Sequence, residues 1–120
     1  MRDHTSLLAW QEARATALEA IHLCRDHWVP YGAAVFSQLQ RASLSVQLNI
    51  AEGYAFTRSA TFNRHLGIAY GSAIEAGELL QILMDSKIVT QERCRNLVIR
   101  NARTQRLLLG LIHQTRRKPR

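Results

Sequence analysis

Apolar residues recur at steps of three and four along most of the chain, which is the period of an amphipathic α-helix. Four such segments can be traced, over about residues 6–28, 33–53, 59–85 and from 90 to near the C-terminus. No stretch shows the strict alternation expected of a β-strand. The pattern therefore predicts an all-α protein, an antiparallel up-down four-helix bundle with long helices and short connections.

Three short breaks separate these segments. Pro30 and Gly32 interrupt the chain after the first segment. Ser59 is the expected N-cap of the third helix. Thr90 together with Glu92 begins the fourth. Helices joined by such short breaks run in alternating directions.

The chain contains two cysteines, Cys24 and Cys94, and no C-x-x-C pair. We interpret them as buried, reduced thiols and not as a disulfide or a zinc site. Cys24 lies late in the first helix and Cys94 early in the fourth. In an up-down bundle both should therefore lie at the same end.

The second segment carries two apolar faces. One is the stripe that the bundle core requires, and the other contains Leu44, Leu48 and Ala51. A single four-helix core does not use both faces. We therefore expect Leu44 and Leu48 to form an interface with another copy of the chain.

The fourth segment has a heptad-like core seam that contains two amides, which are expected to fix the register of the packed helices. Its positions are Cys94, Val98, Asn101, Gln105, Leu108 and Ile112.

In the third segment, Gly67 and Gly71 lie four residues apart. Either they admit a closely packed helix or they are tolerated surface glycines. His65 falls beside the stripe that contains Phe62 and Leu66, and we expect it to be a partly buried packing residue.

Length and composition favour one globular domain over residues 1–120, with a basic tail at about 116–120. The hydrophobic content is 47% and the charged content is 21%, as in folded soluble proteins. The first residues lead into no continuous apolar segment, and the apolar run at 107–112 is too short to span a bilayer. These features predict a cytoplasmic protein that does not bind membranes.

The positive charge is concentrated in the last quarter of the chain. Residues 1–92 contain seven basic and nine acidic residues, whereas residues 93–120 contain nine basic and no acidic residues. On a helical wheel the basic residues of the fourth helix fall opposite its seam, and the tail extends the charge past its end, so that a ridge about 35 Å long would run from Arg93 to Arg117. A solvated helix face would normally carry both signs, so we expect a polyanion to bind this ridge. The expected binding residues are Arg93, Arg95, Arg100, Arg103, Arg106, Arg116, Arg117 and Lys118.

Few sequence motifs of this chain support an enzymatic function. A di-metal bundle site needs Glu-x-x-His motifs on two helices. Only one such motif occurs, at Glu19 and His22, and the wheel turns both residues away from the core. The histidines show no metal-ligand spacing, and no P-loop, dinucleotide fingerprint or nucleophile elbow is present. We therefore expect no catalytic residue, no metal and no cofactor.

The segment "NIAEGYAFTRSATF", residues 49–62, joins the second and third helices and has the composition of either a ligand-binding turn or a helix junction. Gly53 suits a left-handed residue that ends the second helix. Glu52 has two candidate partners, Arg58 and Arg41. We interpret Asn49, Glu52, Gly53 and Arg58 as structural junction residues.

Two stretches carry a family resemblance: "QLQRASLSVQLNIAEGYAFTRS" at 38–59 and "FNRHLGIAYGSAIEAGELL" at 62–80. Over about residues 7–90 the chain resembles the four-helix-bundle proteins encoded in intervening sequences of 23S rRNA genes, also labelled S23 ribosomal proteins. The resemblance implies a homopentamer. It also implies a relationship to accessory proteins of the reverse transcriptases of diversity-generating retroelements, and no catalytic activity.

The sequence thus favours a non-catalytic, self-associating bundle that binds nucleic acid, RNA in preference to DNA, through the fourth helix and the tail. The alternative is an adaptor whose basic ridge docks an acidic protein partner, such as a reverse transcriptase domain.

Overall fold

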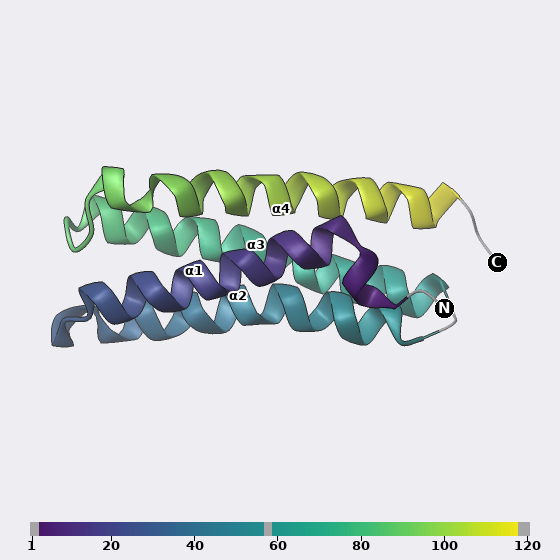
Figure 1. Cartoon of the computed structure of the whole chain (residues 1–120), viewed down its shortest axis with the longest axis horizontal. Helices are drawn as coiled ribbons and strands as arrows, with labels where there is room; N and C mark the ends of the chain where they lie inside the picture. The colour runs from purple at the N-terminus through teal and green to yellow at the C-terminus, as the bar shows by residue number, and fades with distance from the viewer. Residues whose placement is uncertain (1–2, 57–58, 118–120) are drawn as a thin grey trace.

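The computed structural model describes residues 3–56 and 59–117 of the chain. Within these ranges the chain forms four long helices and no strand (Figure 1). Two short 3₁₀ helices, η1 (His4–Ser6) and η2 (Pro30–Gly32), precede the first two long helices. The long helices are α1 (Leu8–His27), α2 (Ala33–Tyr54), α3 (Ser59–Asp85) and α4 (Gln91–Arg117).

The four helices run antiparallel to their sequence neighbours and form one elongated bundle (Figure 1). Helix α1 packs against α2 and α4, and α3 packs against the same two helices from the other side. The bundle measures 48 × 20 × 20 Å along its principal axes. The start of α1 and the end of α4 lie at the same end. The predicted up-down four-helix bundle is confirmed.

Helix α1 begins two residues later than the pattern predicts. The Asp3 side chain caps η1 by accepting a hydrogen bond of 3.0 Å from the backbone N–H of Thr5. This cap stabilises a separate 3₁₀ turn, and Leu7 then takes an extended conformation before the α-helix starts.

The interpretation of Gly53 as a left-handed helix terminator is wrong. Helix α2 continues through Tyr54, and no glycine in the described part of the chain has a positive φ. A Cβ atom added to Gly53 would lie 2.6 Å from the Cβ of His65. Gly53 therefore allows α2 and α3 to approach each other closely, which is a packing role and not a conformational one.

Gly67 and Gly71 do not mark a close approach within the chain. A Cβ at either position would meet no atom within 4 Å, and both residues are exposed on α3. The sequence left two alternatives open, a closely packed helix or tolerated surface glycines. Within the single chain, Gly67 and Gly71 are surface glycines.

The core consists of two clusters of buried side chains, one toward each end of the bundle. The cluster at the η2 end contains both cysteines together with Phe36, Leu80 and Val89. The cluster at the other end contains, among others, Ala9, Val46, Ile50, Leu66, Ala69 and Leu108. The predicted placement of Cys24 and Cys94 at one end is confirmed, and both are free thiols.

The core seam of α4 differs from the predicted one at two positions. Val98 is 39% exposed and Gln105 is half-buried, whereas Leu97 and Thr104 are fully buried. Asn101 lies in the core as expected and donates from Nδ2 to the backbone oxygen of Ala73 at 2.9 Å. The side of α4 that faces the core is thus a fraction of a turn away from the predicted side, in the direction of the residues that face α1.

A tight turn at Lys87 ends α3 and leads toward α4. Lys87 has a φ of 61°, in the left-handed region. Its N–H donates to Met84 O at 3.0 Å, and Ile88 N–H donates to Leu83 O at 3.0 Å. These two bonds define a Schellman motif with lysine at the position that usually holds glycine.

Candidate nucleic-acid interface

Three acidic residues of α1 form a row that faces α4. Glu12, Glu19 and Asp26 are spaced by seven residues, so they lie nearly above one another on one side of the helix. Three arginines of α4 pair with them. Asp26 contacts Arg93 at 3.3 Å near the η2 end of the bundle. We call this set the α1–α4 ion-pair row.

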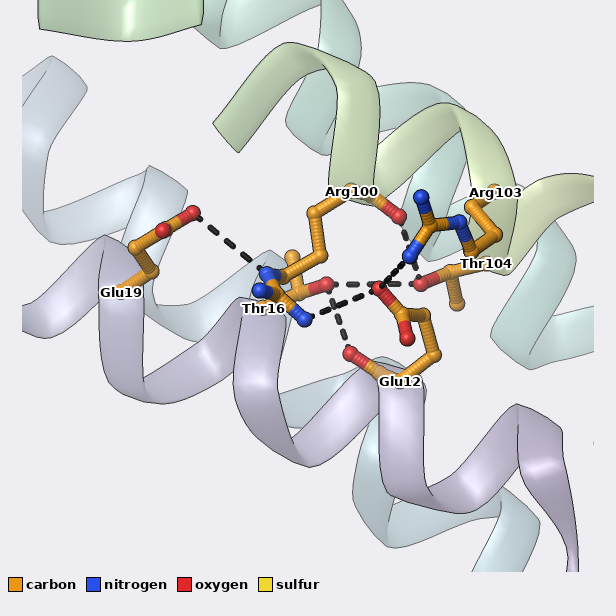
Figure 2. A network of polar contacts seen from close by, with 6 residues as sticks. All are labelled: Glu12, Thr16, Glu19, Arg100, Arg103 and Thr104. Atoms are coloured by element: carbon orange, nitrogen blue, oxygen red, sulfur yellow. Dashed lines mark hydrogen bonds and ion pairs between the residues drawn. The ribbon is translucent and has the colours of Figure 1, made fainter. Parts of the chain in front are cut away.

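Arg100 is the central member of this row (Figure 2). Its Nη1 donates to Glu12 Oε1 at 3.0 Å, and its Nε lies 3.8 Å from Glu19 Oε2. Arg103 contacts the same Glu12 oxygen at 3.5 Å. The Glu12 side chain is only 15% exposed, so water screens these contacts less than it would on an open surface.

The row changes the charge distribution that the sequence suggests. Acidic residues are absent from 93–120, but folding brings three of them from α1 against Arg93, Arg100 and Arg103. Three of the expected binding arginines are therefore engaged in holding α4 against α1. A polyanion would have to compete with carboxylates for them.

Three other arginines of α4 point away from the bundle. Arg95, Arg106 and Arg116 are exposed, and none of the ion pairs found within residues 3–56 and 59–117 involves them. At 100° per residue they fall within about 80° of one another on the wheel, on the side away from α1. We call them the outer arginines. Arg117 ends α4 but its side chain is outside the described part, and Lys118 lies outside the described residues.

Aliphatic side chains separate the outer arginines. Ile99 is 51% exposed and Leu109 is 36% exposed, and both lie on the same outward side of α4. The outer face of α4 is therefore basic and apolar in alternation. It is not a continuous row of guanidinium groups.

A second exposed apolar surface lies on α2. Leu44 is 38% exposed and Leu48 is 52% exposed. The contact of Cys24 Sγ with Phe36 O sets the register of α1 against α2, and it places Leu18 of α1 at about the level of Leu44. Leu18 is 42% exposed. The second apolar face that the sequence predicts for α2 is thus not covered within the chain.

A hydrogen-bonded network connects the expected junction residue Asn49 to α3. Its Nδ2 donates to Ser45 O at 2.9 Å, and its Oδ1 lies 3.0 Å from His65 Nδ1. Because the Asn49 amide nitrogen is used by Ser45, His65 must donate from Nδ1. Phe56 stacks on the His65 ring at a centroid distance of 5.8 Å. The predicted packing role of His65 is confirmed.

The other junction residues add little to this network. Glu52 is exposed, and no ion pair within the described residues joins it to Arg41. Its other candidate partner, Arg58, lies outside those residues.

The Glu-x-x-His motif of α1 does not converge on a common site in the structure. Glu19 and His22 diverge, since Glu19 faces Arg100 and His22 Nδ1 lies 2.7 Å from Arg25. No group of three or more His, Cys, Asp or Glu side chains within residues 3–56 and 59–117 is placed to hold a metal ion.

Burial raises the pKa of the Cys24 thiol to about 11, so it stays protonated at neutral pH. Among the helices described, none has the length and apolarity to cross a membrane.

The fold and the outer face of α4 define a four-helix-bundle protein with a basic, partly apolar exterior. The sequence profile of the 23S rRNA-intervening sequence proteins matches residues 5–110, and the chain belongs to this family.

A solved structure agrees with this assignment at the level of the fold. It is a crystal structure of a protein of unknown function from the S23 ribosomal protein family of Bacteroides thetaiotaomicron VPI-5482. The two chains share 21% sequence identity with a TM-score of 0.81, over 88% of this chain and 98% of that one. No curated protein matches the chain.

Proposed function

We propose that this protein is a non-catalytic, self-associating bundle that binds nucleic acid in the cytoplasm, RNA in preference to DNA, through the outer arginines of α4. The observation that carries the proposal is the exposure of Arg95, Arg106 and Arg116 without an acidic partner among the described residues. Guanidinium groups bind phosphates bidentately and stack on unpaired bases. The formal net charge of +7 would add long-range attraction to any polyanion.

The spacing of the outer arginines favours contacts with separate phosphates. At 1.5 Å per residue, Arg95 and Arg106 are about 16 Å apart along α4, and Arg106 and Arg116 about 15 Å. Neighbouring phosphates of one strand are closer than this, so each arginine would reach a different part of a folded RNA. The arginines of the ion-pair row would contribute less, because releasing them costs their contacts with α1.

The test is a binding series with labelled structured RNA and duplex DNA at increasing salt concentration. Changing Arg95, Arg106 and Arg116 to glutamine should flatten the slope of log affinity against log salt by about 2 to 3, since each lost phosphate contact contributes about 0.7 to 0.9. The matched control changes Arg14, Arg41 and Arg64 to glutamine. These three are also exposed, lie on the other helices, and lower the net charge by the same amount.

Equal flattening in both triple variants would show that only net charge matters and would overturn the assignment to α4. No binding by the wild-type protein at about 50 mM salt would overturn nucleic-acid binding itself, because the electrostatic contribution is largest there.

The second candidate function is an adaptor that docks an acidic protein surface. The exposed Ile99 and Leu109 between the outer arginines favour it, because apolar side chains contribute to protein interfaces more than to phosphate contacts. The family resemblance implies a reverse transcriptase domain as one such partner.

Self-association is expected to use the exposed surface around Leu44 and Leu48, with five copies implied by the family resemblance. Changing both residues to glutamate should lower the particle mass measured by light scattering, because charges would be buried in an apolar contact. The double change Gln91→Glu and Gln114→Glu serves as a control, because both residues are exposed on α4, away from the α2 patch, and the charge changes by the same amount. An unchanged mass in the leucine variant would remove this surface from the interface.

A further inference from the structure

Four buried polar residues lie in the core between its two apolar clusters. They are Thr16, Ser43, Asn101 and Thr104, each no more than 3% exposed. None of them belongs to either apolar cluster. We call this set the polar layer.

The members of the polar layer lie at nearly the same height in the bundle. Thr16 Oγ1 and Thr104 Oγ1 are 3.3 Å apart, which brings α1 and α4 together at this level. Asn101 contacts Ala73 O, and Thr104 is less than one turn further along α4.

Ser43 of α2 is placed by the neighbouring contact between α2 and α3. Ser45 Oγ and Ser72 Oγ are 2.8 Å apart, so Ser43 falls within about one turn of the level of Ala73. It therefore shares the height of Asn101, on the helix diagonally opposite.

The hydrogen-bond inventory of the layer is incomplete. Thr16 donates to Glu12 O at 2.8 Å and Thr104 donates to Arg100 O at 3.0 Å. Each hydroxyl has one proton, so none is left for the contact between the two threonine oxygens. Asn101 Oδ1 and Ser43 Oγ are buried and have no hydrogen-bond partner among residues 3–56 and 59–117. The layer thus holds one unused donor, the Ser43 hydroxyl, and several unused acceptors.

We propose that the polar layer binds one internal water molecule. The water accepts a hydrogen bond from the Ser43 hydroxyl and donates to Asn101 Oδ1 and to one of the threonine hydroxyl oxygens. Three hydrogen bonds are typical of buried waters. In this arrangement the water uses the free Ser43 hydroxyl donor and supplies donors to Asn101 Oδ1 and to one threonine oxygen. A metal cation is disfavoured because the layer contains only neutral oxygens.

The water would need room in the core, and small side chains near the same level would leave it. The neighbouring core positions Ala20, Ala42 and Ala73 are all alanine and all buried. Larger aliphatic residues occur on both sides along the bundle axis, in the two apolar clusters.

The direct test is a crystal structure at high resolution. We expect an isolated density peak within about 2.5 to 3.0 Å of both Ser43 Oγ and Asn101 Oδ1. A Ser43 hydroxyl turned onto the Leu39 carbonyl of its own helix, with no density between α2 and α4, would overturn the proposal.

A thermodynamic cycle tests the proposal in solution. The single changes Ser43→Ala and Asn101→Ala and their combination should show coupling of more than about twofold in the unfolding equilibrium constant, because the two residues share the water. The control cycle replaces Ser43→Ala by Ser45→Ala. Ser45 lies on the same helix but bonds Ser72 outside the layer. The effects of Ser45→Ala and Asn101→Ala on the unfolding equilibrium constant should therefore be independent of each other. Independent behaviour of Ser43 and Asn101 would contradict a shared water.

Discussion

Replacing Phe36 with alanine should reduce the free energy of unfolding by about 3–5 kcal/mol, the range observed when a buried phenylalanine is truncated. Phe36 is fully buried in the cluster at the η2 end, and its ring packs beside Trp28 at a centroid distance of 5.6 Å. Gly32 lies against the same ring, since a Cβ there would come within 2.9 Å of it. The surrounding helices hold the space open, so the cavity would collapse only partly.

Chemical and thermal denaturation followed by circular dichroism would measure this loss. Tyr31→Ala is the control, because Tyr31 is an aromatic residue five positions away that is 79% exposed. Its removal should change stability by no more than about 0.5 kcal/mol. All proteins must be compared at one concentration, since self-association would add a concentration-dependent contribution. A loss below about 1 kcal/mol for Phe36→Ala would contradict the described packing.

The second large effect is expected at two glycines, where the same change to alanine should shift the free energy of unfolding in opposite directions. Gly53→Ala should destabilise the bundle by about 1–2 kcal/mol, because overpacking exceeds the gain in helix propensity. The new methyl group would lie 2.6 Å from His65 Cβ and 3.0 Å from Phe62 Cδ1. Neither atom is the far end of a flexible side chain, so α2 and α3 would have to separate. This would lengthen the hydrogen bond between His65 and Asn49.

Gly67→Ala is the matched control for this change. It lies within α3, is exposed and has open space around its Cα, so alanine should stabilise the protein by about 0.5–1 kcal/mol. Denaturant unfolding of the two variants beside the wild type compares them directly. Stabilisation by Gly53→Ala would show that α2 and α3 are not in close contact at this position.

The candidate site was only partly predictable from the sequence. The concentration of basic residues in the fourth helix is visible in the chain, and so is the second apolar face of α2. The division of the arginines into an ion-pair row and an outer set is not. It depends on which side of α4 faces Glu12 and Glu19, some 80 residues earlier in the chain, and no local pattern contains that information.

The core seam of α4 shows the same limit more closely. Val98 and Leu97 are adjacent and both apolar, so a spacing of three and four fits either one. The orientation of α4 was decided by what lies on each side of it, namely the carboxylates of α1 and the Ala73 carbonyl of α3. Favourable pairing of Arg100 and burial of Asn101 are obtained together only when Leu97 and Thr104 turn inward.

The sequence by itself determined the four helices, most of their boundaries, the up-down arrangement and the family, because helical periodicity and helix breaks are local properties. Only the tertiary structure decided the role of Gly53, the partners of Arg93, Arg100 and Arg103, and the composition of the polar layer. These depend on the distances between helices and on their rotation about their axes. Both result from packing side chains from all four helices into one core.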